Sequence, residues 1–232
     1  FPKCNSIHIK TVGFGTEKIE EELQIYFPNI KIGRMDLETT RTRNAYERII
    51  NEFDEGELDV LVGTQMVSKG LDFKNVALVG ILDADSMISF PDFRAHERAF
   101  QLMTQVAGRA GRYHKRGKVV IQTMNPYHFV IQKVIENNYE DLALQLMRER
   151  KRFNYPPYYR TIKITVKHKE KSKVDDLAEK LANRLKAIFK DDLVGPEYPH
   201  IAWVRAKYNK NILLKIGPDR NLKSVKNQII DL

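Results

Sequence analysis

Residues 59–73 read DVLVGTQMVSKGLDF, an apolar run that passes directly into a loop rich in glycine and polar residues. A nearly pure apolar run between turn residues predicts a strand covered on both faces, as in a parallel sheet. Open α/β sheets bind their ligands at the carboxyl ends of such strands. The loop over residues 64–73 is therefore the first candidate for a binding site.

The first two thirds of the chain alternate short apolar runs with helical patterns. This alternation predicts parallel strands joined by helices, an α/β fold. Thr16 is the expected N-cap of the first helix, which carries acidic residues in its first turn. The expected strands are residues 8–12, 30–35, 59–63, 76–82 and 118–122, and the expected helices are residues 16–27, 41–53, 93–110 and a helix from about residue 127.

A domain boundary is predicted between residues 152 and 153. A charged helix end runs there into Tyr155-Pro-Pro-Tyr-Tyr159, and two prolines end a helix. Residues 1–152 would form the α/β domain, and residues 153–232 a small α+β domain. In the second domain the expected strands are residues 161–166, 201–206 and 211–216, the expected helices are residues 174–189 and 222–230, and Gly195-Pro196 is an expected turn.

Charge is unevenly distributed along the 232 residues. Residues 1–150 carry 20 basic and 21 acidic side chains, whereas residues 151–232 carry 19 basic and 9 acidic ones. The excess of positive charge is typical of a nucleic-acid footprint, and equally of a lysine-coated surface, so both interpretations stay open. No run of about 18 apolar residues and no signal pattern occurs, so a membrane span or secretory route is not expected.

The most specific segment is Gln105-Val-Ala-Gly-Arg-Ala-Gly-Arg112, QVAGRAGR, at the end of a helical pattern. Arg109 and Arg112 are three residues apart and can point at one site, and guanidinium groups match phosphate oxygens. In the earlier loop, Thr64 and Lys69 can donate to phosphate, and Asp72 can accept from a sugar hydroxyl. The alternative for QVAGRAGR is a helix C-cap with glycine and arginine.

Together these two segments resemble motifs V and VI of the superfamily 2 helicases. GTQMVSKGLDF (63–73), LVGILDAD (78–85), PDFRAHERAFQLMTQVAGRAGR (91–112) and VIQTMNPYH (120–128) are similar to the PriA family of bacterial primosome-assembly helicases. The resemblance implies the second RecA-like lobe, incomplete at its N-terminus, followed by a C-terminal domain that binds DNA and protein. It implies an ATP-dependent DNA helicase of 3′ to 5′ polarity that recognises stalled or abandoned forks and restarts replication by primosome assembly.

The resemblance also implies roles for individual residues. The catalytic group is Gln105, Arg109 and Arg112, the ATP-binding group is Gly70, Asp72 and Gly108, and the DNA-binding group is Thr64, Gln65 and Lys69. Lys207 and Asn211 would bind the acidic C-terminal tail of single-strand DNA-binding protein. Because the family usually has arginine at the first of these two positions, lysine would lose bidentate recognition of a carboxylate.

The resemblance implies further partners and a location. The partners are forked and single-stranded DNA, other primosome proteins and the loader of the replicative helicase. The protein is expected to be a monomer in the bacterial cytoplasm. The charge of residues 151–232 predicts DNA binding there, with Lys207 and Lys210 in the contact. Trp203 and Tyr208 could stack on bases, but the alternation of Ile201, Trp203 and Arg205 favours packing of Trp203 in the core.

Several family features are absent from the sequence. It has no G-x-x-x-x-G-K-[ST] loop and no Asp-Glu-x-His box, so we expect these 232 residues alone to bind no cofactor and to be inactive. ATP, Mg²⁺ and zinc would belong to the full-length protein. Residues 1–8 are interpreted as the remnant of a zinc-binding insertion, in which Cys4 is a ligand only together with upstream cysteines, because one thiol cannot form a tetrahedral site. The chain begins with Phe1, where a partner cysteine would stand, and is expected to be a fragment.

The sequence is compatible with two other functions. A non-catalytic scaffold, in which a degenerate helicase lobe supports a basic DNA-binding and protein-binding domain, is the alternative from a different class. An RNA helicase or DNA translocase of the same superfamily is disfavoured by the C-terminal third, which such enzymes would not share.

Overall fold

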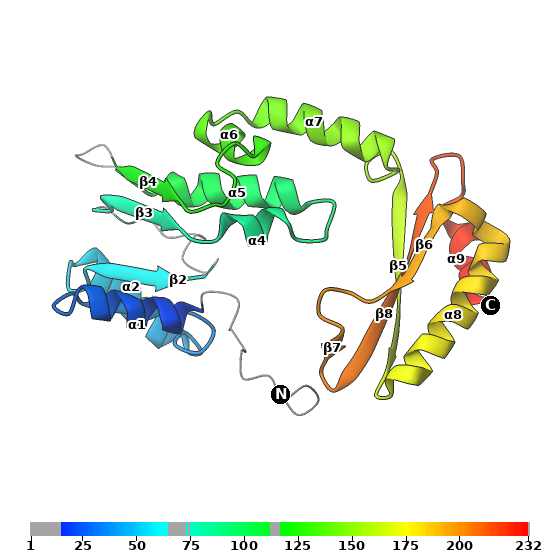
Figure 1. Cartoon of the computed structure of the whole chain (residues 1–232), viewed down its shortest axis with the longest axis horizontal. Helices are drawn as coiled ribbons and strands as arrows, with labels where there is room; N and C mark the ends of the chain where they lie inside the picture. The colour runs from blue at the N-terminus through cyan, green and yellow to red at the C-terminus, as the bar shows by residue number, and fades with distance from the viewer. Residues whose placement is uncertain (1–14, 65–72, 74, 112–116, 232) are drawn as a thin grey trace. The chain divides into compact units, whose positions relative to one another are not determined.

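The structure is a computed structural model of the chain that describes residues 15–64, 73, 75–111 and 117–231. It divides into two compact units. The first ends at Phe90 and resumes over Arg94–Tyr139, and the second contains Pro91–Phe93 and the residues from Glu140 onward. The chain therefore passes between the units at three points. The expected α/β class, with a small α+β domain after it, is confirmed (Figure 1).

The strands of the first unit pair in parallel. β1 (Ile32–Met35) pairs with β2 (Val60–Gly63), and β3 (Leu78–Ile81) pairs with β4 (Lys118–Ile121). Among the described residues these are two separate two-stranded sheets rather than one. Val62 is the buried residue of β2, and Leu61, on the opposite face, is partly buried and packs against a core cluster of this unit.

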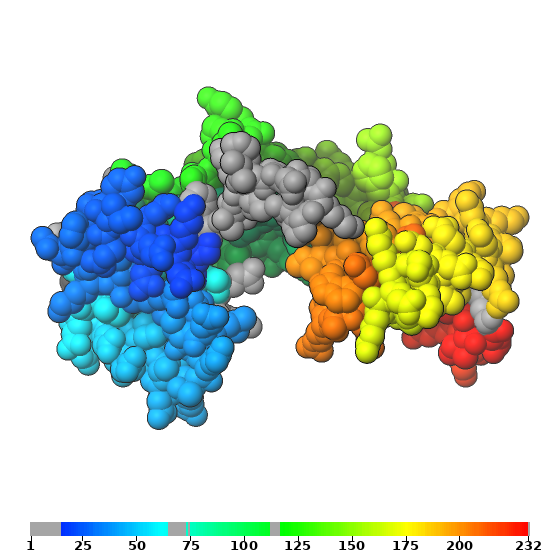
Figure 2. All heavy atoms as spheres, turned by 60° about the horizontal axis from the view of Figure 1, so that its bottom comes forward, coloured from blue at the N-terminus to red at the C-terminus, as the bar shows by residue number. Residues whose placement is uncertain are grey.

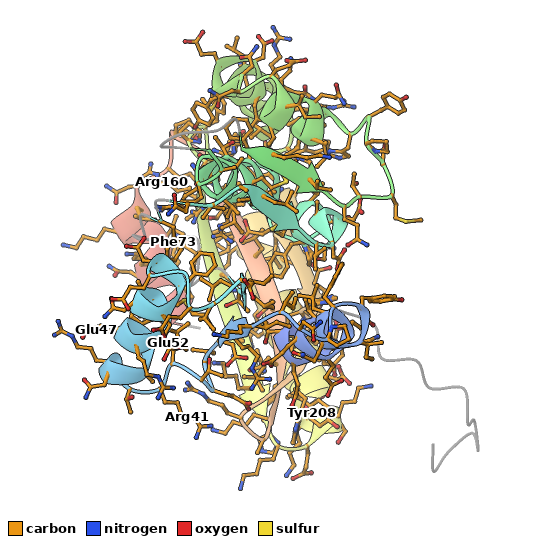
Figure 3. The ribbon with its side chains drawn as sticks, turned by 90° about the vertical axis from the view of Figure 1, so that its left-hand side faces the viewer. Arg41, Glu47, Glu52, Phe73, Arg160 and Tyr208 are labelled. Carbon is orange, nitrogen blue, oxygen red and sulfur yellow. The ribbon has the colours of Figure 1, made fainter. Side chains whose placement is uncertain are left out.

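The helices of the first unit are α1 (Thr16–Tyr26), α2 (Arg43–Asp54), α4 (Ala84–Ile88), α5 (Ala95–Ala107) and α6 (Phe129–Ile135). The predicted N-cap of α1 is wrong, since Gly15 occupies that position and Thr16 begins the helix. A small core cluster joins Met35, Ile49 and Phe73. In it Phe73, which Figure 3 shows beside α2, meets the ring of Phe53 edge to face at 4.8 Å.

The second unit is an antiparallel sheet with helices on one face. β5 (Arg160–His168), β8 (Lys207–Ile216) and β6 (Leu193–Glu197) lie in the order β5-β8-β6, and β7 (Trp203–Val204) pairs with β8. α8 (Lys171–Phe189) and α9 (Leu222–Ile230) supply the core partners of the sheet. The expectation of a turn at Gly195-Pro196 is wrong, because both residues lie within β6. They occupy an irregular stretch of the strand, where the pairing register with β8 shifts between Val194 and Glu197.

A stack of aromatic and basic side chains joins the remaining parts of the second unit. α7 (Tyr139–Arg152) ends just before Tyr155, whose ring stacks on Phe93 at 4.8 Å. The guanidinium of Arg150 lies 5.3 Å from the centroid of the Phe93 ring, and the ammonium of Lys215 lies 4.1 Å from that of Tyr155. The short segment Pro91–Phe93 is thereby held in the second unit. No helix in the described part of the chain is long and apolar enough to cross a membrane.

Candidate functional site

The carboxyl ends of β1 and β2 lie side by side at one edge of their sheet. Met35 pairs with Gly63 in parallel register, so the residues that follow, Asp36 and Thr64, lie next to each other along that edge. Thr64 is exposed. The structure thus places Thr64 where an open α/β sheet receives a ligand.

Asp36 organises this edge. Its carboxylate accepts backbone N–H groups of Glu38 and Thr39, each at 2.9 Å, and the hydroxyl of Thr16 at 2.8 Å. The guanidinium of Arg34 lies 3.2 Å away. The Thr39 amide foremost, and then the Thr16 hydroxyl, lower the pKa of Asp36 from 3.8 to about 2. The carboxylate therefore fastens the start of α1 and the turn after β1 to the strand end.

This role of Asp36 is not among those expected from the sequence. The signal that could have found it is Asp36-x-x-Thr39, an aspartate able to accept backbone amides two and three residues later. Such a turn is common, so the pattern predicts local structure more strongly than a site.

QVAGRAGR begins on the last turns of α5. The buried face of this helix carries Ala99, Phe100 and Met103. Gln105 lies off that face and is exposed, as is Gly108, the C-cap, whose N–H donates to the carbonyl of Thr104. Arg109 is half-buried, and its Nε is shielded from solvent. The structure therefore presents Gln105 and Gly108 outward and holds the inner part of Arg109 within the fold.

The turn after α5 is closely packed against its surroundings. The N–H of Gly111 donates to the carbonyl of Val76 at 3.0 Å, which joins the turn to the segment before β3. Gly111 has φ 77°, a conformation that glycine adopts at least cost. A Cβ on Gly117 would overlap the backbone of Ala110 and Gly111. Both glycines are thus required by geometry to keep this turn beside the two strands.

A second polar network lies at the carboxyl ends of β3 and β4. The carboxylate of Asp85 accepts the hydroxyl of Thr123 at 2.9 Å and the N–H of Met124 at 2.8 Å. The bond from Met124 is the main cause that lowers the pKa of Asp85. The side-chain oxygen of Gln122 accepts the N–H of Asp83 at 3.2 Å. Asp85 therefore ties the two strand ends together.

Lys207 and Asn211 both lie on β8, four residues apart, so alternation along the strand places them on the same face. Lys207 is exposed. The side-chain oxygen of Asn211 accepts the hydroxyl of Thr165 at 2.9 Å. The structure brings both residues to one face of the sheet, but the side-chain oxygen of Asn211 is engaged in a hydrogen bond with Thr165 of β5.

Two expectations for this domain are wrong. Lys210 is buried, and its ammonium contacts Asp175 at 3.0 Å and Glu179 at 3.3 Å, so it is neutralised within the fold rather than presented to DNA. Trp203 does not pack in the core. It is 50% exposed, because β7 is a two-residue strand at the edge of the sheet, and its ring lies 4.5 Å from that of Tyr208.

The other predicted site residues lie outside the described residues: Cys4, Gln65, Lys69, Gly70, Asp72 and Arg112. The described part of the candidate nucleotide-binding and DNA-binding site in the first unit therefore consists of Thr64, Gln105, Gly108 and Arg109. Over the residues that the structure describes, no group of three His, Cys, Asp or Glu side chains could hold a metal ion.

Two family models match the chain. The helicase conserved C-terminal domain matches residues 6–114, and the primosomal protein N C-terminal domain matches residues 151–231. The first match includes both segments that resemble motifs V and VI, and the second includes the antiparallel sheet and both of its helices.

Curated proteins are similar over nearly the whole chain. The replication restart protein PriA of Bacillus subtilis (strain 168) is 42% identical over 99% of this chain and 29% of that protein. PriA of Synechocystis sp. is 38% identical over 92% of this chain and 26% of that protein, and PriA of Treponema pallidum is 39% identical over 92% and 33%. The chain thus spans about a quarter to a third of these relatives. Among solved structures, the C-terminal domain of the DEAD-box protein Dbp5 matches 56% of this chain and 67% of that chain, with 17% identity and a TM-score of 0.37.

Proposed function

The chain belongs to the PriA family of replication restart proteins, and from this membership we propose that it forms the second RecA-like lobe and the C-terminal domain of an ATP-dependent DNA helicase. In this proposal the whole protein moves 3′ to 5′ on DNA, recognises stalled or abandoned replication forks and restarts replication by primosome assembly. It acts in the bacterial cytoplasm on forked and single-stranded DNA.

The observation that carries the proposal is the arrangement of QVAGRAGR. Gln105 and Gly108 are exposed at the end of α5, and the turn that follows is fastened to the segment before β3. We assign Gln105, Arg109 and Arg112 to the γ-phosphate, where a fixed guanidinium stabilises charge that develops in the transition state. Gly108 lets backbone approach the nucleotide, with Gly70 and Asp72 in the same group.

DNA contact is assigned to Thr64, Gln65 and Lys69, the loop after β2. The exposure of Thr64 at the carboxyl edge of the parallel pair supports this. A hydroxyl, an amide and an ammonium contact phosphate and sugar without reading sequence, so binding would depend on salt and little on base identity. An enzyme that acts at any fork requires that behaviour.

The cofactors of the whole protein would be ATP, Mg²⁺ and zinc. This sequence lacks the Gly-Lys-Ser/Thr phosphate loop and the acidic box, and the described residues offer no acidic cluster for a metal. In the proposal this part contributes arginines and a glutamine to a site that other parts of the protein complete. Zinc would involve Cys4 together with cysteines of those other parts.

Lys207 and Asn211 are proposed to meet the acidic tail of single-strand DNA-binding protein. They lie on one face of β8, and Lys207 has no acidic partner within the described chain. A lysine there gives a point charge rather than a bidentate fork, so we propose modest affinity for the tail. Other primosome proteins and the helicase loader would bind elsewhere on the whole protein.

ATP hydrolysis with and without forked DNA tests the proposal. The 232-residue chain should be inert and the full-length parent stimulated by DNA, and Arg109→Ala in the parent should lower the stimulated rate by roughly 10³-fold. Arg48→Ala is the matched control, because Arg48 is exposed on α2 and its acidic partner among the described residues is Glu52 of the same helix. If the parent is inert, or Arg109→Ala retains its rate, the scaffold function replaces this one.

A further inference from the structure

The tight turn between β7 and β8 has an unusual backbone. Val204 pairs with Lys207, so the turn has two central residues, Arg205 and Ala206, with φ 51° and 58°. Two-residue hairpins need positive φ at both positions and normally use asparagine and glycine there. Side chains with a Cβ are disfavoured in this region by roughly 1–2 kcal/mol each. Unfavourable backbone conformations of this kind concentrate at functional sites.

An aromatic pair lies beside this turn. Trp203 is directly opposite Tyr208, with their ring centroids 4.5 Å apart, and half of the tryptophan is exposed. Figure 3 labels Tyr208, and Figure 2 shows the orange atoms of this part of the chain at the surface beside the yellow atoms of α8. The two ring planes are tilted by 59°, so Tyr208 braces the indole at an angle. An exposed aromatic ring that is fixed by a neighbouring ring can serve as a stacking platform.

The hairpin is held in one conformation by a buried asparagine. The N–H of Asn209 donates to the carbonyl of Ala202 at 2.8 Å. Its side-chain amide donates to the carbonyls of Ala202, at 3.2 Å, and Lys207, at 3.3 Å. A preorganised platform loses little entropy when a ligand binds.

The charge around the platform is positive. Residues 198–208 contain Arg205 and Lys207 and no acidic residue. Both cations are exposed, and neither has an acidic partner within the described chain. Lys167 and Lys169 are exposed at the neighbouring end of β5, where His168 pairs with Tyr208. Exposed cations that lack internal partners favour an anionic ligand.

We propose that the β7–β8 hairpin is a stacking site for an unpaired base of single-stranded DNA, with Trp203 as the platform and Arg205, in the adjoining turn, at the neighbouring phosphate. Aromatic stacking flanked by cations is the general basis of single-strand binding without sequence preference. An acidic peptide would satisfy a cation, but the exposed aromatic ring suits a flat base better than an aliphatic side chain. The inference rests on the proposed function, which makes DNA the substrate.

Trp203 makes the test direct, because it is the only tryptophan of the sequence. The 232-residue protein is titrated with oligo(dT), and binding is followed by anisotropy of the labelled oligonucleotide and by tryptophan fluorescence. We expect the fluorescence to be quenched in parallel with binding. Trp203→Ala should weaken binding by roughly 5-fold to 150-fold, the loss that corresponds to one stacked base at about 1–3 kcal/mol, and Trp203→Phe should weaken it less.

Ile201→Ala is the matched control, since Ile201 is 66% exposed in the same segment but offers no ring, and it should change affinity less than about twofold. Arg205→Ala should reduce the slope of log affinity against log salt by about 1. Far-UV circular dichroism checks that each variant is folded. The fluorescence titration of the unmutated protein tests the proposal independently of whether any variant folds.

The outcomes separate this inference from the proposed function. If oligo(dT) binds but the fluorescence of Trp203 and the affinity of Trp203→Ala are both unchanged, the inference is overturned while DNA binding stands. Equal quenching by blunt duplex DNA, or quenching by an acidic peptide and not by oligo(dT), also overturns it. If no DNA binds by anisotropy, the DNA-binding role proposed for this part of the protein fails first.

Discussion

Replacing Asp36 by asparagine removes a charge that three hydrogen bonds and one guanidinium stabilise in the folded state. A pKa lowered from 3.8 to about 2 corresponds to about 2 kcal/mol, at about 1.36 kcal/mol for each tenfold change in proton affinity. The side chain is 14% exposed, so solvent screens this interaction only in part. We therefore expect Asp36→Asn to lower the free energy of unfolding of the first unit by about 2 kcal/mol at pH 7.

The effect has a defined pH dependence. Because folding lowers the pKa of Asp36, its contribution to stability is fully present above the ordinary value of 3.8 and is lost as the pH falls through about 2. The difference between the parent protein and Asp36→Asn should stay constant from about pH 7 to pH 5 and then shrink. Near pH 2 it should be about half lost or more.

Urea denaturation followed by far-UV circular dichroism measures this difference in the 232-residue protein. Fluorescence of Trp203, which lies in the second unit, should show little change in its midpoint. Glu38→Gln is the matched control, because it removes a negative charge two residues away whose carboxylate makes none of these bonds. If Asp36→Asn is within about 0.5 kcal/mol of Glu38→Gln at pH 7, or if its deficit persists undiminished at pH 2, the reasoning is refuted.

Three further substitutions test other parts of the structure. Gly117→Ala should displace the turn after α5 and lower the DNA-stimulated ATPase rate of the parent at least tenfold. Gly80→Ala is the control, because a Cβ at Gly80 meets open space, and it should not lower the rate. Equal rates for the two variants would contradict the close packing at Gly117. Lys210→Ala should lower the stability of the second unit by about 1–2 kcal/mol. Since contact with Asp175 raises the pKa of Lys210, this contribution to stability should be lost as the pH rises above 10.5. The DNA affinity of Lys210→Ala, measured by anisotropy, should equal that of the parent protein. A loss of affinity would restore Lys210 as a DNA contact. Phe93→Ala should lower the free energy of unfolding of the second unit by about 2 kcal/mol, because its stacking partner Tyr155 lies in that unit. Trp203 fluorescence should report this loss as a lower urea midpoint, and an unchanged midpoint would argue against the stack.

The type and order of many elements could be predicted from the sequence. α9 has the expected bounds, and β5 and α8 differ from expectation by a few residues at their ends, where hydrogen bonding rather than periodicity sets the limit. α4 was missed because it is only five residues long and begins after Asp83, which has positive φ. One turn of helix leaves no periodic pattern to detect.

The errors at Lys210 and Trp203 have a common origin. Alternation along a strand predicts which residues share a face, but not what covers each position. Lys210 lies opposite acids from α8, which are far away in the sequence, and therefore becomes a buried ion pair. Trp203 lies on β7, the short edge strand that pairs with β8, where its side chain remains half exposed. In the candidate site, the position of Thr64 followed from the strand before it, whereas the anchoring roles of Asp36 and Asp85 depend on contacts between segments.

The passage of Pro91–Phe93 through the second unit affects the order in which the protein can fold during synthesis. Phe93 leaves the ribosome before Tyr155 exists, and at about 5–20 residues per second its stacking partner follows roughly 3 to 12 seconds later. A first unit that folds during that interval forms around a segment that has no partner yet. A first unit expressed alone would carry this aromatic segment bare, and a second unit expressed from residue 140 would lack one face of its Tyr155 stack.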